Sequence, residues 1–113
     1  MTAQNILTML KANLEKRNSL NDDYIRDLII PAAISEIQRE GITLHTADVE
    51  GETDYTDLEE VNAIVMQAAY YYRQRASSTE NYQTAALHPQ GEPYMLRLAK
   101  NNLLFSQKMR AET

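Results

Sequence analysis

The side chains most able to do acid–base chemistry in this sequence are two histidines, His45 and His88. Histidine is the usual general base near neutral pH because its pKa lies close to that pH. Both histidines fall in segments predicted to be loops, and neither belongs to a recognisable catalytic motif. We therefore interpret both as surface residues and expect no catalytic site, so the chain is predicted not to be an enzyme.

Carboxylates alternate along the segment Asp48-x-Glu50-x-Glu52-x-Asp54, a pattern that invites comparison with a calcium-binding loop. An EF-hand loop needs a glycine at its sixth position for a sharp turn and a glutamate at its twelfth. Counted from Asp48, Glu59 falls at the twelfth position but Thr53 occupies the sixth. The missing glycine argues against a calcium loop, and we expect no metal and no cofactor.

Other reaction classes lack the residues that they need. The chain has no cysteine, which excludes disulfides, thiolate metal sites and cysteine nucleophiles. It has neither a glycine-rich phosphate loop nor a nucleophile elbow. The run Tyr70-Tyr71-Tyr72 could suggest base stacking, but consecutive helical residues point about 100° apart and cannot form one platform. We assign these tyrosines to a core and an interface.

Charge is unevenly distributed in a chain whose formal net charge is −5. Seven acids and no Lys or Arg lie between Asp48 and Glu60, whereas four bases and no acid lie between Pro93 and Arg110. These segments are either two solvated faces or surfaces of opposite sign that meet in neighbouring subunits. The acidic balance disfavours stable binding to nucleic acid. No apolar run approaches a membrane span, and the N-terminal segment lacks the features of a leader, so we expect a cytoplasmic protein.

The elements that would position these residues are helices. Apolar residues at helical spacing predict helices over Ala3–Lys16, with Thr2 as N-cap, and over Asp22–Gly41. In the second helix one apolar stripe gives way to another at Pro31, which predicts a kink near Asp27–Pro31 or two helices. Residues 42–55 are predicted to be irregular, with a short strand over Ile42–Thr46 as an alternative.

The C-terminal half predicts two more helices. Thr56 and Glu59 fit a capping box that starts a helix reaching about Arg75, and Pro93 suits the first position of a helix ending near Lys108. The residues between them, 76–92, are predicted to be a long loop. The fold class is therefore all-α: one domain over residues 1–113, a small bundle of about four helices with long connecting loops.

Two surfaces are predicted to meet other chains. In the third helix, Ala63, Met66 and Tyr70 form a ridge opposite the core-facing arc, and a helix that is apolar on two sides needs two partners. In the last helix the apolar half is predicted to face inward, with Asn102 and Ser106 in its middle as a satisfied core pair or as a polar contact that sets subunit register. The predicted interface residues are Ala63, Met66, Tyr70, Arg97, Asn102, Leu104, Phe105, Ser106 and Lys108.

Three blocks of the chain resemble the bacteriophage head–tail connector family, whose members are also called head-completion or adaptor proteins. The blocks are DDYIRDLIIPAAISEIQREGI, DYTDLEEVNAIVMQAAYYYRQR and PYMLRLAKNNLLFSQKM. The last is the most specific, with its proline-led start, its Asn101-Asn102 pair and its Leu-Phe-Ser-Gln-Lys ending. Together the blocks cover over half of the chain in the expected order.

The resemblance implies a helical protomer that assembles into a homo-oligomeric ring in the virion, at the head–tail junction. Such a ring sits below the portal protein, extends the DNA channel and offers a docking surface to the tail-side completion protein. DNA would pass without sequence-specific binding, helped by an acidic lumen that repels it. Assembly would take place in the host cytoplasm, without a membrane. A helical protein-binding or regulatory module of a phage or prophage is the alternative function.

Overall fold

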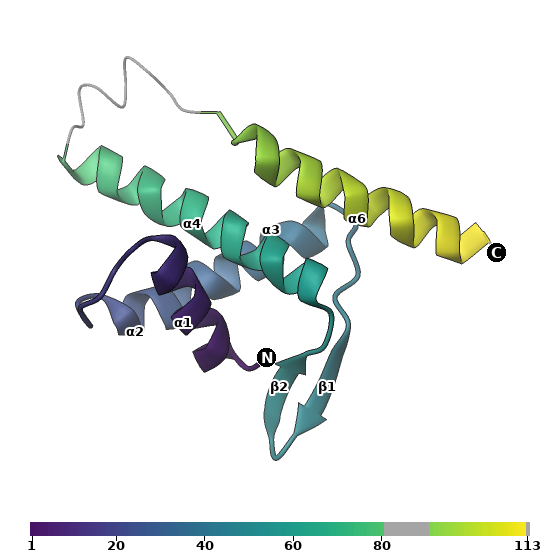
Figure 1. Cartoon of the computed structure of the whole chain (residues 1–113), viewed down its shortest axis with the longest axis horizontal. Helices are drawn as coiled ribbons and strands as arrows, with labels where there is room; N and C mark the ends of the chain where they lie inside the picture. The colour runs from purple at the N-terminus through teal and green to yellow at the C-terminus, as the bar shows by residue number, and fades with distance from the viewer. Residues whose placement is uncertain (81–90, 113) are drawn as a thin grey trace.

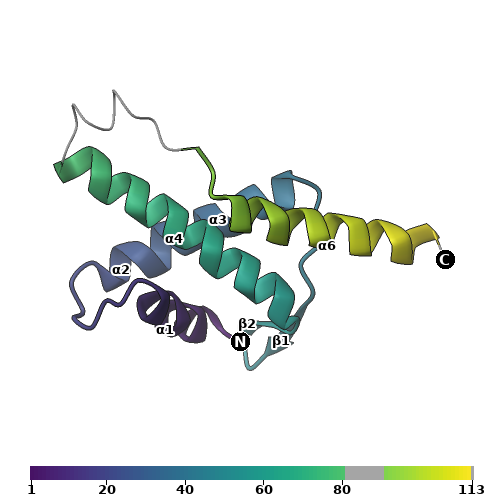
Figure 2. The ribbon, with the colours of Figure 1, turned by 45° about the horizontal axis from the view of Figure 1, so that its top comes forward.

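The computed structural model describes the backbone of residues 1–80 and 91–112, and the side chains of residues 1–74 and 91–110. Four helical stretches and one β-hairpin make up this part of the chain (Figure 1). Helix α4 lies at the centre, against α1 and α3 on one side and against α6 on another (Figures 1 and 2). The protein is therefore mostly helical, but the two-stranded sheet corrects the prediction of a strictly all-α fold.

Helix α1 spans Ala3–Asn13, and its start was predictable from the sequence. Thr2 is the N-cap and forms a capping box with Asn5, whose side chain accepts from the Thr2 backbone N–H. Its apolar stripe, Ile6, Leu7 and Leu10, is fully buried. The predicted separation of the first two helices is confirmed, but α1 ends at Asn13 and not at Lys16, while the next helix begins at Asp22 as predicted.

The second helical stretch changes its winding halfway along. It comprises α2 (Asp22–Tyr24), a π-helical turn η1 (Ile25–Ile29) and α3 (Ile30–Arg39). Within η1 the Ile30 N–H donates to the Ile25 carbonyl, five residues back instead of four. A proline ring clashes with the carbonyl four residues earlier in a regular α-helix, and the wider turn directly precedes Pro31. The sequence predicted a kink near Asp27–Pro31 or two helices; the structure has instead a π-helical turn within a continuous helical stretch.

The extra residue of the π turn also settles which apolar residues face the core. The buried positions along this stretch are Ile25, Ile29, Ile30, Ala33 and Ile37, which share one face because the wide turn shifts their phase. Leu28 and Ala32, predicted to belong to an apolar stripe, are exposed instead. The two stripes seen in the sequence are therefore one buried face, interrupted by a single inserted residue.

Residues 46–55 form a β-hairpin, which corrects the prediction of an irregular segment. Strand β1 (Thr46–Val49) pairs antiparallel with β2 (Glu52–Tyr55), in the register Thr46–Tyr55 to Val49–Glu52. Glu50 and Gly51 make the turn with φ values of 53° and 82°, as a two-residue turn of the I′ kind requires. The sequence carries only a weak signal for this hairpin because both strands are mostly polar and largely exposed.

Helix α4 spans Leu58–Glu80, so its end lies beyond the predicted Arg75, and residues 76–80 are helical instead of looped. Its start is also capped differently from the prediction. The Asp57 carboxylate accepts from the backbone N–H groups of Glu59 and Glu60, whereas Thr56 bonds the His45 carbonyl. The N-cap is therefore Asp57, and the predicted Thr56–Glu59 capping box is wrong.

The core is shared by α1, η1, α3 and α4. Its α4 residues are Val61, Ala63, Ile64, Val65, Ala68 and Ala69. Ala63 is 0% exposed, so its predicted place on an uncovered ridge is wrong, while Met66 and Tyr70 are half-buried. Because α4 is apolar around most of its circumference, its own chain covers most of it. Among the described residues, no helix is long and apolar enough to cross a membrane.

Candidate functional site

Helix α6 (Tyr94–Glu112) packs against the rest of the protein with a face that differs from the one predicted. Its buried residues are Leu96, Lys100 and Leu103, with Gln107 half-buried on the same side. Lys100 was predicted to lie on a solvated half of the helix and is only 1% exposed. Asn102, predicted to sit in the apolar core, is exposed. The predicted rotation of this helix about its axis is therefore wrong.

A buried ion cluster sets this rotation. The Lys100 ammonium donates to Glu40 Oε2 at 2.5 Å and to Gln67 Oε1 at 2.7 Å, and it also pairs with Glu92. Arg97, one turn earlier, pairs with the same two carboxylates at 2.7 Å each. Two cations and two anions balance, and the cluster ties α6 to the end of α3 and to the middle of α4. Another rotation of α6 would take Lys100 and Arg97 away from Glu40 and Gln67 and leave these acceptors without their partners.

The pKa values of the cluster reflect this pairing. Burial by itself raises the pKa of Glu40, but hydrogen bonds and charge from Lys100 and Arg97 outweigh it and hold that pKa below its ordinary value. The pKa of Arg97 is raised, because the hydrogen bonds that it donates to the Glu40 and Glu92 carboxylates favour its charged form. Both groups are therefore ionised at neutral pH, as the geometry of the cluster requires.

A second polar anchor holds α6 farther along, at Gln107. Its side-chain amide donates to the Thr43 carbonyl at 2.8 Å and accepts from the Thr43 N–H at 2.9 Å, as a neighbouring strand would. The same amide reaches Glu60 at 3.4 Å. The two anchors lie seven residues apart on one face of α6, on either side of the buried Leu103.

The outward side of α6 is largely apolar. Its exposed residues include Phe105 at 68% and Met95 at 61%, together with Tyr94, Leu98 and Met109. We call this surface the open face of α6. In both views the C-terminal half of α6 projects past the ends of the other helices (Figures 1 and 2). An apolar helix face in this position is typical of a protein-binding surface.

A groove runs beside the open face, between α6 and the start of α4. It is lined by Leu58, Glu59, Asn62, Ala99, Asn102, Leu103 and Ser106. Leu58 adds an apolar side chain that is 69% exposed. Of the predicted interface residues, Asn102, Phe105 and Ser106 thus border or form one surface. Arg97 lies in the ion cluster and Leu104 packs partly against the core, while Lys108 is exposed on the flank of the helix.

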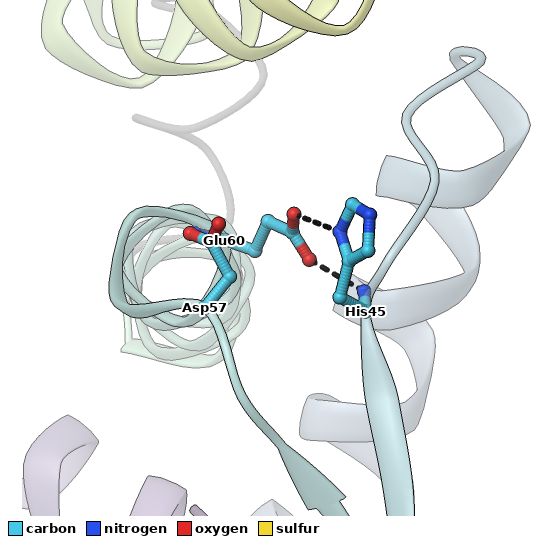
Figure 3. A group of neighbouring side chains, drawn as sticks. All are labelled: His45, Asp57 and Glu60. Atoms are coloured by element: carbon cyan, nitrogen blue, oxygen red, sulfur yellow. Dashed lines mark hydrogen bonds and ion pairs between the residues drawn. The ribbon is translucent and has the colours of Figure 1, made fainter.

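His45, Asp57 and Glu60 form the described group whose atoms lie close enough to hold a metal ion (Figure 3). His45 Nδ1, Asp57 Oδ1 and both Glu60 oxygens already make hydrogen bonds within the chain. Glu60, 2% exposed, accepts from the His45 backbone N–H and contacts His45 Nδ1, both at 2.6 Å. Asp57 caps α4 instead of facing this pair. The group therefore fastens the hairpin to α4. His88, the other histidine, lies outside the described residues.

Sequence reasoning missed Lys100 and Glu60 as buried charges, because their partners lie 60 and 15 residues away in the chain. Comparison with family models, curated proteins and solved structures found no match to this chain. What the protein does must therefore be inferred from its own surfaces. The open face of α6 is the feature that its fold leaves without an internal role.

Proposed function

We propose that this protein is a non-catalytic structural protein of a bacteriophage, which forms a ring between portal and tail, completes the head and extends the DNA channel. One observation carries the proposal: α6 buries a lysine and turns an apolar face outward. A helix in a self-sufficient bundle gains free energy by burying its apolar side. The opposite arrangement suits a subunit whose surface another chain covers.

The family resemblance supports the same proposal. Its most specific block, residues 93–109, contains the open face. The hairpin supplies a compatible charge pattern, because Asp48, Glu50 and Glu52 are exposed and the chain has no Lys or Arg between Arg39 and Arg73. An acidic surface of this kind, turned toward a channel, lets DNA slide without sticking.

The test is the mass of the assembly with and without a portal. The purified chain is mixed with the portal protein encoded near it, and light scattering measures the mass of the complex. We expect many copies of the chain to add to each portal ring. Phe105→Glu should abolish the gain in mass, because it places a charge on the open face. Thr8→Glu, at an exposed position of α1, should leave the gain unchanged.

A portal that gains no mass from the wild-type chain would refute the connector role. If the chain instead captured a single host or phage protein through the open face, the alternative of a protein-binding or regulatory module would replace it. Thermal melts of both variants establish that each is folded, so that lost assembly is not mistaken for lost structure.

A further inference from the structure

The exposed residues of α6 follow a heptad spacing. Met95, Leu98, Asn102, Phe105 and Met109 are separated by three, four, three and four residues, and all five are exposed. This spacing matches the a and d positions of a coiled coil, with Met95, Asn102 and Met109 at a, and Asn102 is the one polar residue among the five. We call these five residues the seam. Of the other described exposed residues of the helix, Tyr94, Asn101 and Lys108 flank the seam at g, and Arg110 lies farther round at b.

The seam and the anchored face lie on nearly opposite sides of the helix. At 100° per residue, the seam is centred about 150° from the mean direction of Leu96, Lys100, Leu103 and Gln107. The ion cluster and the Gln107 anchor therefore hold α6 with its seam outward. A partner helix can lie along the seam without displacing any contact that α6 makes within its own chain.

We infer that in the free protein the seam pairs with the seam of a second copy, as two parallel α6 helices in register. Asn102 favours a second copy as the partner, and it favours a parallel orientation of the two helices. In a parallel, in-register pair the two Asn102 amides face each other and can hydrogen-bond. In an antiparallel pair each would face an apolar residue, and a buried amide without a partner costs a few kcal/mol.

The flanks of the seam suit the same pairing. In a parallel pair the e flank of one helix faces the g flank of the other. The e flank carries the small residues Ala99 and Ser106 beside Glu59 of α4, and the g flank carries Asn101 and Lys108. In register, a g residue faces the e residue five positions on in the partner, so Tyr94 and Asn101 face the small side chains of Ala99 and Ser106, which leave room for the second helix. Leu58, on the groove, adds apolar contact.

The seam is short, about two heptads, and an isolated helix of 15 residues is only marginally stable in water. Here the helix is already formed and anchored, so pairing need not supply the free energy of folding it. This inference rests on the proposed function, because it names what covers the open face before a portal is present. A closed pair does not by itself make a ring, which needs a second, heterologous contact.

The absence of cysteine allows a direct test by disulfide cross-linking. Asn102→Cys places one thiol at the centre of the seam, where the paired Cα atoms would lie within disulfide range. Asn101→Cys, an exposed neighbour on the g flank, is the matched control. We expect mild oxidation to link Asn102→Cys into dimers at least about tenfold faster than Asn101→Cys. Equal rates would overturn the inference.

Sedimentation equilibrium of the free chain gives an independent readout. Asn102→Leu should tighten self-association by about tenfold or more, since an apolar a residue replaces a polar one. Phe105→Glu should leave a monomer. A wild-type chain that stays monomeric at every concentration, together with an unchanged Asn102→Leu, would refute the pairing. The connector role would still stand if the wild-type chain adds mass to portal rings, so the two failures are distinguishable.

Discussion

Lys100 shows how one residue can decide the surface of a whole helix. Its ammonium is buried, contacts Glu40, Glu92 and Gln67, and lies on the side of α6 opposite the seam. Helical periodicity alone would turn the apolar half inward and leave this lysine in water. The structure has the reverse arrangement, in which Lys100 meets its three partners, and removing one member of such a buried cluster is strongly destabilising.

Lys100→Ala should lower the free energy of unfolding by about 3 kcal/mol, because it leaves two partly buried carboxylates with Arg97 alone. Urea denaturation followed by circular dichroism measures the change. Lys108→Ala, at an exposed position of the same helix, should change stability by less than about 0.5 kcal/mol. If both variants lose the same amount, the ion cluster does not hold α6.

Protonation of Glu40 at acidic pH should also lower the free energy of unfolding. Its pKa is lower in the folded protein than its ordinary value of 4.5, so the unfolded chain binds the proton more tightly. The stabilisation is present above that value and is lost as the pH falls through the folded pKa. Asp22 and Asp27, whose pKa values are also lowered, act in the same direction. Thermal melts of the wild type and of Glu40→Gln, from pH 6 to pH 3, measure the contribution of Glu40. The variant should lose less thermal stability over this range than the wild type does.

The second helical stretch owes its single buried face to one extra residue. The π turn η1 brings Ile25 and Ile30, five residues apart, onto the same side, after which Ala33 and Ile37 follow with α-helical spacing. Deleting one exposed residue from the turn would leave these residues four, three and four apart, an ordinary α-helical stripe. The sequence of this stretch is thus an α-helix with one insertion, placed just before its proline.

Deletion of Leu28 combined with Pro31→Ala should therefore preserve the fold, with a melting temperature within about 5 °C of that of Pro31→Ala alone. Deletion of Ser35 in the same background is the control. It removes an equally exposed residue from α3 but turns Ile37 off the buried face, which should lower the melting temperature by more than about 10 °C. Similar losses from both deletions would show that the π turn has no special role.

At the scale of the whole molecule, α6 is the least integrated of the long helices. It contributes Leu103 to the main core, while α1, η1, α3 and α4 share the rest. Helix α6 is held by two polar anchors and not by a continuous apolar contact. A protein built in this way has one stable body and one helix that can open separately.

Native-state hydrogen exchange should detect this difference. We expect the amide of Leu103 in α6 to exchange through an opening of lower free energy than the amide of Ile64 in α4, which should open only with global unfolding. Lys100→Ala should lower protection in α6 further and leave the relative order within α1, α3 and α4 unchanged. Equal protection of Leu103 and Ile64 would mean that α6 folds and unfolds with the core.

Much of the fold was predictable from local signals. Thr2 as a cap, the break at residues 18–21 and the irregularity at Pro31 all depend on residues close together in the sequence. The hairpin escaped prediction because its strands are short and largely exposed, and the only alternating apolar residues, Ala47 and Val49, span three positions. The local signal for the hairpin lies in its turn, where Gly51 adopts a positive φ.

By itself, then, the sequence determined which segments are helical and where most helices begin, because caps and apolar periodicity act within one or two turns of chain. Only the tertiary structure decided which way α6 faces and that Ala63 is buried. Those outcomes depend on partners such as Glu40, which lies 60 residues from Lys100 and meets it only after the chain has folded. Apolar periodicity predicts the buried face of α1, whereas in α6 the face that meets the core also carries Lys100 and its partners.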